Sequence, residues 1–155
     1  MKKITLVKDI MSTKLIKLSP EMSLAEAARM FCQYDFSGAP VTDKDDSLVG
    51  ILSEKDLFQA LYPKTQEICE DNNLALLADP LSLEERLKEA GDVQVKDIMT
   101  KKIISTYGDE PIIFVGAKMM AKHIHRLPVL ENGKLVGLVS RRDIYKEIFK
   151  DLFSL

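Results

Sequence analysis

The chain has 155 residues and a formal net charge of −2, and 46% of its residues are hydrophobic while 30% are charged. This balance is typical of one compact globular unit, or of two half-domains that share a core. It excludes the overall basic field of a nonspecific nucleic-acid binder. Because no apolar run approaches the length of a membrane span or of a signal peptide, we expect a cytoplasmic protein with neither a membrane nor a nucleic-acid partner.

The most informative pattern is an internal repeat. Val-Lys-Asp-Ile-Met at residues 7–11 returns letter for letter at residues 95–99, an offset of 88 (95 − 7). Residues 48–57 then match residues 135–144 at an offset of 87 (135 − 48), with one residue lost in a turn, where such changes are tolerated. Two copies are too few for a solenoid, so we expect a closed pseudo-twofold pair with its function at the seam between the copies.

Each copy is predicted to run strand, helix, strand, turn, strand, helix. In copy one, a short strand is expected at 15–18, and Ser23 with Glu26 forms a capping box that begins a helix. Apolar residues recur on one face of that helix, at Leu24, Ala27, Ala28 and Phe31. Strands are expected at 39–42 and 48–52, and the last element begins at Ser53. Cys32 is predicted to be a reduced thiol in or near a core.

Residues 59–94 belong to neither copy. A capping box at Ser82 and Glu85 predicts a helix near 82–90, which Gly91 can end. Copy two then repeats the apolar stripe of copy one, at Ile112, Val115, Gly116 and Met119. Asn132-Gly133 predicts a tight hairpin, because both residues tolerate positive φ. The last element of copy two begins at Ser140.

The ordered set of motifs resembles the tandem CBS-domain pair, a module named after cystathionine β-synthase. The resemblance rests on Lys-Asp-Ile-Met at 8–11 and 96–99, on His-Arg-Leu-Pro-Val at 125–129, and on the Ser-x-x-Asp stretches after Gly50 and Gly137. It implies an α+β fold of two βαββα half-domains packed by their sheets. On this interpretation repeat 1 spans 1–62, a partly helical connector spans 63–94, and repeat 2 spans 95–155.

The same resemblance implies a function. Such a stand-alone module is expected to be regulatory and not an enzyme, to bind AMP, ADP, ATP or S-adenosylmethionine as a regulatory ligand without a required cofactor, and to form a homodimer that acts on an unidentified protein. One alternative is a ligand-free dimerisation scaffold. The other is an enzyme, for which the sequence offers no Gly-rich phosphate loop, metal-ligand spacing or nucleophile elbow.

A Ser-x-x-Asp pair begins the last helix of each copy: Ser53 with Asp56, and Ser140 with Asp143. On the functional interpretation, the carboxylate accepts hydrogen bonds from the two hydroxyls of a ribose, and the helix N-terminus beside it suits a phosphate. On the alternative interpretation, Ser and Asp form a capping box worth about 1 kcal/mol with no ligand. The two roles can coexist.

Copy two gathers positive charge around this helix start. Arg141 and Arg142 stand in the first helical turn, where cations oppose the helix dipole, and His125 and Arg126 precede the hairpin. We interpret them as a polyphosphate grip; the alternative is a solvated basic edge, or pairing with acids elsewhere. Copy one has Ser-Gly and Glu-Lys at the matching positions, so we expect two unequal clefts.

The family resemblance assigns further residues to each cleft. The cleft of Ser140 and Asp143 is expected to be completed by Thr13, Lys14, Leu15, Ile16, Phe36 and Ser37. The cleft of Ser53 and Asp56 is expected to use Lys101, Lys102, Ile103, Ile104, Ile124 and His125, with the two lysines as phosphate ligands. Ile51 and Leu138 are expected to hold the adenine, although by spacing alone they are core residues. His123 and His125 lack a third ligand, so no metal site is predicted.

Overall fold

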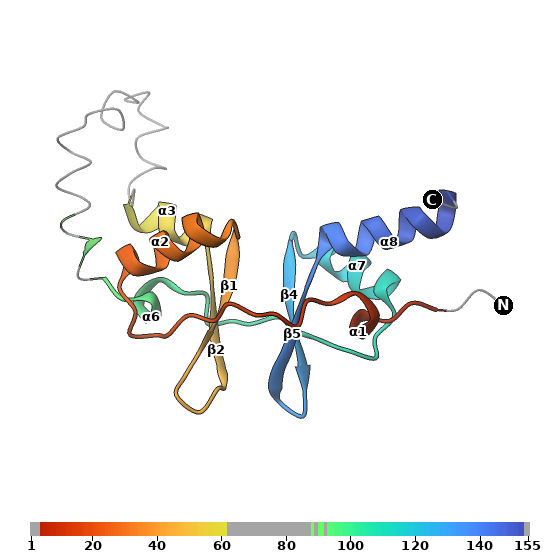
Figure 1. Cartoon of the computed structure of the whole chain (residues 1–155), viewed down its shortest axis with the longest axis horizontal. Coiled ribbons are helices and arrows are strands. Elements are labelled where there is room, and N and C mark those ends of the chain that lie inside the picture. Colours follow the sequence, from red (N-terminus) through yellow and green to blue (C-terminus); the bar gives the residue numbers. More distant parts are fainter. Residues whose placement is uncertain (1–3, 62–87, 89, 92, 154–155) are drawn as a thin grey trace, which may run out of the picture. The chain divides into compact units, whose positions relative to one another are not determined.

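The computed structural model describes residues 4–61, 88, 90, 91 and 93–153. Helices and strands alternate along this part of the chain, as expected for the α+β class (Figure 1). The elements are α1 (Val7–Ile10), α2 (Leu24–Tyr34), β1 (Gly38–Thr42), β2 (Leu48–Ser53), α3 (Glu54–Leu61), α6 (Val95–Ile98), β3 (Thr106–Tyr107), α7 (Ile112–Ala121), β4 (Arg126–Glu131), β5 (Lys134–Ser140) and α8 (Arg141–Phe153).

The chain forms two compact units that cut across the two sequence repeats. Unit 1 comprises Met1–Ile16, Lys44–Leu48 and Ile103–Leu155, and unit 2 comprises Lys17–Asp43 and Val49–Lys102. Each unit therefore contains most of one repeat together with the opening motif of the other.

Unit 1 is built on a three-stranded sheet in the order β3-β4-β5. Strand β3 runs parallel to β4, and β4 runs antiparallel to β5 with Arg126 opposite Ser140. The hairpin between β4 and β5 turns at Asn132 and Gly133, whose φ angles of 49° and 78° confirm the predicted turn. The core of this unit packs α7 and α8 on the sheet through Val7, Ile112, Val115, Met119, Leu127, Val129, Val139 and Ile144.

Unit 2 has the same plan with fewer strands. Strands β1 and β2 pair with each other, and the expected strand at 15–18 is reduced to one parallel bridge between Leu18 and Val41. The core packs α2 and α3 against these strands, and it includes Leu24, Ala27 and Phe31 from the predicted helix stripe. The predicted capping box is also formed: Glu26 N–H donates to Ser23 Oγ at 3.2 Å, and Ser23 N–H donates to Glu26 Oε2 at 2.9 Å. These bonds lower the pKa of the Glu26 carboxyl.

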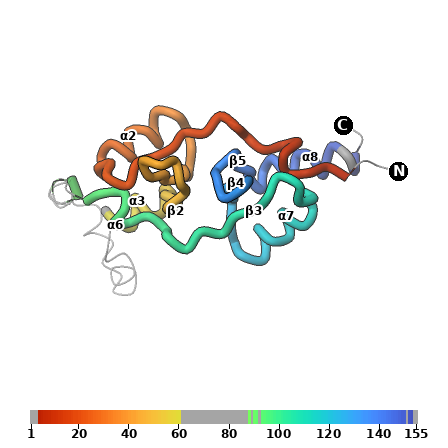
Figure 2. Tube along the Cα trace, turned by 90° about the horizontal axis from the view of Figure 1, so that it is seen from below, coloured from red at the N-terminus to blue at the C-terminus, as the bar shows by residue number. Residues whose placement is uncertain are grey.

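The opening motif forms a short helix that packs on the opposite repeat. In unit 1, the Val7 N–H donates to the Glu110 carbonyl at 3.0 Å, and the Lys8 N–H donates to the Gly108 carbonyl at 2.9 Å. In unit 2, Val95 and Lys96 make the equivalent bonds to Met22 and Pro20 at 2.9 and 3.0 Å. Figures 1 and 2 show α1 beside α8, whereas α6 contacts α3. The two repeats have thus exchanged their first helices.

Three residues of the motif have a clear physical role in this exchange. The valine is fully buried, at 0% exposure for both Val7 and Val95. The aspartate caps the helix, since Asp9 Oδ2 accepts from the Leu6 N–H at 3.0 Å. The methionine lies against a glycine of the receiving strand: a Cβ built on Gly137 would stand 2.5 Å from the Met11 sulfur. Any larger residue at this position would have to displace the Met11 side chain.

The structure corrects one expectation, and a second concerns residues that it does not describe. Cys32 is exposed, so its predicted place in or near a core is wrong, because the apolar stripe of α2 turns Leu24, Ala27 and Phe31 inward and leaves Cys32 on another face. The helix predicted near 82–90 falls almost wholly outside the residues that the structure describes.

Candidate functional site

The Ser-x-x-Asp pair of copy two lies at the junction of β5 and α8. The Asp143 N–H donates to Ser140 Oγ at 3.1 Å, and the Ser140 N–H donates to Asp143 Oδ2 at 3.3 Å. The Ser140 hydroxyl also donates to Asp143 Oδ2. The capping box predicted as one of the two roles is therefore formed. Within the described part of the chain, Asp143 Oδ1 accepts no hydrogen bond.

Copy one repeats this geometry at the junction of β2 and α3. The Ser53 N–H and hydroxyl donate to Asp56 Oδ2 at 2.8 and 2.6 Å, and the Asp56 N–H donates to Ser53 Oγ at 3.3 Å. Ser53 and Asp56 are both half-buried, whereas Asp143 is exposed. Asp56 Oδ1, like its counterpart, accepts no hydrogen bond from the residues that the structure describes.

The predicted basic residues of copy two gather around the start of α8. The Arg141 N–H donates to the His125 carbonyl at 2.9 Å, and the Arg141 Nη2 lies 2.9 Å from His125 Nδ1. Because a guanidinium only donates, the Nδ1 atom of His125 is the acceptor in this contact. Arg126 stands opposite Ser140 in the strand ladder. At the matching place in copy one, the Glu54 N–H donates to the Ser37 carbonyl at 3.2 Å, and no cation comes from that residue.

Strand-like bridges join the opening segments to the last strand of each unit. In unit 1, Ser12 and Leu138 exchange two backbone hydrogen bonds of 2.8 and 2.9 Å in an antiparallel bridge. In unit 2, Thr100 and Ile51 exchange the equivalent bonds of 2.9 and 3.1 Å. Ile51 and Leu138 are half-buried and lie outside the two buried core clusters.

The predicted site residues are divided between the two units. Unit 1 contains Thr13, Lys14, Leu15, Ile16, Ile103, Ile104, Ile124, His125, Ser140 and Asp143. Unit 2 contains Phe36, Ser37, Ser53, Asp56, Lys101 and Lys102. Phe36 packs on the core of its own unit, with its ring 4.6 Å from that of Phe31, and Ile104 and Ile124 pack on the core of unit 1. Their predicted contribution to a cleft of the other copy stays a prediction.

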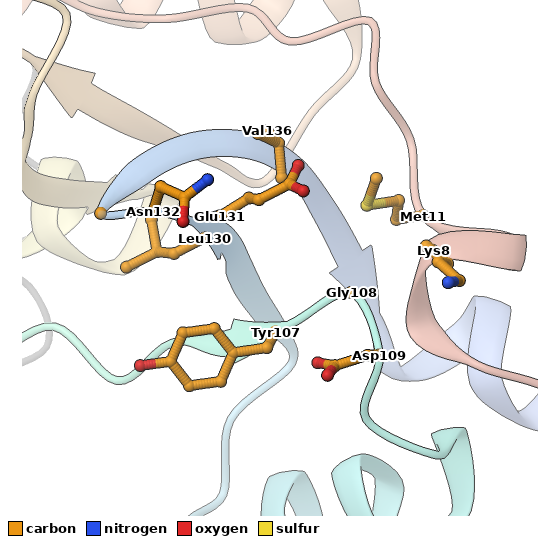
Figure 3. Close-up of a pocket in the computed structure, with 10 residues that line it drawn as sticks. Lys8, Met11, Tyr107, Gly108, Asp109, Leu130, Glu131, Asn132 and Val136 are labelled. Atoms are coloured by element: carbon orange, nitrogen blue, oxygen red, sulfur yellow. The ribbon is translucent and has the colours of Figure 1, made fainter.

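A pocket of about 570 Å³ lies elsewhere in unit 1, at the tip of the β4–β5 hairpin (Figure 3). Its lining comes from α1, from the residues that follow β3, and from the hairpin. Sequence reasoning missed it, because Tyr107 and Asp109 belong to no motif and reach the hairpin only through the parallel pairing of β3 with β4.

The described residues form neither a membrane-spanning helix nor a metal-binding cluster. No described helix is long and apolar enough to cross a membrane. No group of three or more His, Cys, Asp or Glu side chains is placed to hold a metal ion in the part of the chain that the structure describes.

The chain is similar to proteins that differ in length. It is 36% identical to the uncharacterized protein MJ1426 of Methanocaldococcus jannaschii, over 94% of this chain and 92% of that protein. It is 29% identical to the L-aspartate semialdehyde sulfurtransferase of the same organism, but it spans only 23% of that enzyme. The resemblance to the enzyme is thus confined to a minor part of its length.

Solved structures of CBS domain pairs have the same fold. The CBS domain pair of protein MJ0100, in complex with 5′-methylthioadenosine and S-adenosyl-L-methionine, matches with a TM-score of 0.74 and 27% identity, over 96% of this chain and 99% of that one. CBSX2 in complex with AMP matches with a TM-score of 0.73 at 21% identity, over 95% of this chain and 98% of that one, which shows the fold alone. The family model of the CBS domain matches residues 7–63 and 95–150. With two matched copies over most of its length, the chain belongs to the CBS-domain family.

Proposed function

We propose that this chain is a regulatory module that binds an adenosine-type ligand, with the ribose held at the Ser-x-x-Asp helix starts. The observation that carries the proposal is shared by both repeats. Oδ2 of Asp56 and of Asp143 accepts bonds from the preceding serine, and Oδ1 keeps its acceptor capacity for a ribose hydroxyl. The CBS domain pair of MJ0100, which is 27% identical, supports the ligand class, since it binds two adenosine derivatives.

We propose that the two repeats differ in the charge of the ligand group that they accept beside the ribose. In copy two, Arg141 contacts His125 at the start of α8, and Arg126 lies opposite Ser140 in the strand ladder, so basic residues surround the helix start where we place the ligand. This arrangement suits a phosphorylated adenosine such as AMP, ADP or ATP. In copy one, Glu54 stands at the position of Arg141 and makes an anion less favourable at that helix start, so a phosphate there would depend on Lys101 and Lys102, and a neutral or cationic adenosyl group would not need them.

A thermal-shift panel tests the ligand class. The panel contains AMP, ADP, ATP, S-adenosylmethionine, 5′-methylthioadenosine and the guanine nucleotides. A ligand at about 100 times its dissociation constant stabilises a fold by about 2.7 kcal/mol, which raises the melting temperature of a chain of this size by roughly 5–10 °C. No shift with any member at millimolar concentration contradicts the proposal and favours a ligand-free scaffold. Formation of a product from any nucleotide would instead indicate an enzyme.

Asp143→Asn separates capping from ligand binding. An asparagine side chain still accepts from backbone N–H groups, so the melting temperature without ligand should stay within about 2 °C of the parent. An amide is a poorer acceptor for the two hydroxyls of a ribose, so calorimetric titration with the active nucleotide should lose the copy-two binding step. Asp56→Asn is the matched control and should remove the copy-one step instead. Unchanged binding in the double variant would mean that both aspartates only cap.

We also propose that the chain forms a homodimer through α7 and α8. These helices pack on each other, and their exposed side chains include large apolar groups that are rarely left in water: Ile113, Phe114, Met120, Phe149, Leu152 and Phe153, all between 51% and 68% exposed. A second copy presents the same apolar face, as a twofold interface requires.

Sedimentation equilibrium tests the homodimer. The parent chain should have twice its 17.5 kDa mass at micromolar concentration, and Phe114→Ser, at 68% exposure, should shift the mass toward the monomer. Phe58→Ser is a control of comparable exposure, at 54%, on α3. A monomeric parent, or equal dissociation by the two substitutions, contradicts this interface.

A further inference from the structure

The pocket in unit 1 is separate from the Ser-x-x-Asp site. It is lined by Lys8, Met11, Tyr107, Gly108, Asp109, Leu130, Glu131, Asn132, Gly133 and Val136, none of which belongs to the cluster around Ser140 and Asp143. Figure 3 shows the Tyr107 ring and the Asp109 carboxylate on one side, the hairpin residues on the facing side, and Lys8 with Met11 on a third side. The walls thus combine charges of both signs with apolar surface.

The charges in this pocket do not neutralise one another. The side chains of Lys8, Asp109 and Glu131 take part in no ion pair within 4.0 Å and in no hydrogen bond among the residues that the structure describes. One ammonium and two carboxylates therefore line a single pocket with their hydrogen-bonding capacity available. A ligand with the complementary charges can pair with all three at once.

The equivalent place in unit 2 keeps the same signs of charge but lacks the aromatic ring, which makes it an internal comparison. At the offset of 88, Lys96 matches Lys8 (96 − 8), Glu21 matches Asp109 and Asp43 matches Glu131, whereas Ser19 stands in place of Tyr107. There the Ser19 hydroxyl donates to Glu21 Oε2 at 2.7 Å, so the acid already has a partner within its own repeat. This bond is the largest cause of the lowered pKa of the Glu21 carboxyl, and Lys96 lowers it further. Copy two has an aromatic ring, Tyr107, where copy one has that hydroxyl.

The composition of the pocket specifies a class of ligand. Two carboxylates and one ammonium match a molecule with two cationic groups and one carboxylate. The Tyr107 ring, 56% exposed, offers a face to one of the cations, and Met11, Leu130 and Val136 offer apolar contact to a carbon chain between the charges. A volume of about 570 Å³ lies in the ordinary range for a small-molecule site.

We propose that this pocket binds a basic α-amino acid such as lysine, ornithine or arginine. The α-carboxylate pairs with Lys8, and the two cationic groups pair with Asp109 and Glu131. The hydrocarbon stem lies along Met11 and Leu130. The module then carries an amino-acid site in addition to its proposed adenosine sites, and this second site does not depend on the first.

Calorimetric titration of the full chain with defined probes tests the ligand class. L-lysine and L-arginine should bind. Two probes that each lack one charged group, L-norleucine without the far cation and cadaverine without the carboxylate, should bind at least about tenfold more weakly, the loss of about 1.4 kcal/mol expected for one unpaired charge contact. Nα-acetyl-lysine amide, which represents a lysine within a protein, lacks both the α-ammonium and the α-carboxylate and should bind more weakly still. Absence of binding by lysine and arginine at ten millimolar, or equal binding by norleucine, overturns the proposal.

Matched variants place the ligand in this pocket. Lys8→Gln and Glu131→Gln should each weaken lysine binding by about tenfold or more, while thermal melts show that the fold is kept. Lys96→Gln and Glu21→Gln, the counterparts in copy one, should leave lysine binding unchanged. Asp143→Asn should also leave it unchanged, which separates this proposal from that of the adenosine site. An equal loss in the copy-one variants would contradict the assignment to this pocket.

Discussion

Replacing Val7 by alanine is expected to destabilise unit 1 by about 2 kcal/mol, although Val7 stands in the first sequence repeat. The side chain is 0% exposed, and it packs with Val115, Val139 and Ile144 of the second repeat. Its lost methyl groups leave a cavity there. Hydrogen exchange measures the effect: amides of α7 and α8 should exchange faster, while those of α2 keep their protection.

Val95→Ala is the mirror control. Val95 is also 0% exposed, but it packs in the core of unit 2 with Leu24 and Leu52. This variant should speed exchange in α2 and leave α7 and α8 protected. If Val7→Ala loosens α2 more than α7, the opening helices are not exchanged between the repeats in solution.

Gly50→Ala is expected to lower the free energy of unfolding by about 1–3 kcal/mol, the usual cost of overpacking a core. A Cβ at this position would stand 2.3 Å from the Met99 sulfur, 2.9 Å from its Cγ and 3.3 Å from its Cβ. The sign of the effect is informative, because alanine in place of a strand glycine otherwise stabilises by roughly 0.5–1 kcal/mol. Denaturant unfolding of the single variant gives the value.

A double-mutant cycle shows whether the methionine causes this loss. Met99→Ala alone should destabilise by leaving a cavity, but the double variant Gly50→Ala/Met99→Ala should be more stable than the sum of the two losses by about 1 kcal/mol or more. The new methyl group then occupies space that the methionine has left. Simple additivity would mean that the two residues do not contact each other in solution.

Local rules predicted much of each repeat. The helix stripe of α2, the Ser23 capping box and the turn at Asn132-Gly133 depend on residues a few positions apart, and all three are confirmed. The opening motif was not recognised as a helix, because four residues are too short to show a period. The exchange of these helices between repeats was also beyond local reasoning: identical motifs at 7–11 and 95–99 fit either repeat equally well.

The sequence predicted which residues form the candidate site better than it predicted which of their side chains contact one another. The repeated motif located Ser140 and Asp143, and the first turn of α8 pointed to Arg141. The sequence grouped His125 with Arg141, but the hydrogen bond between their side chains, which stand 16 positions apart, depends on the β4–β5 ladder. The pocket of unit 1 was missed for the same reason: its charges come from α1, the residues after β3 and the hairpin, and only the tertiary fold brings them together.

The exchanged opening helices also fix an order of events during synthesis. The hydrogen bond from Val7 to Glu110 joins residues 103 positions apart (110 − 7). At about 5–20 residues per second, α1 leaves the ribosome roughly 5–20 s before its docking surface has been translated. The residues of unit 2, 17–43 and 49–102, include α6 and can fold in the meantime. The first helix to be made is therefore among the last to be seated, and its apolar side chains stay uncovered until the second repeat arrives.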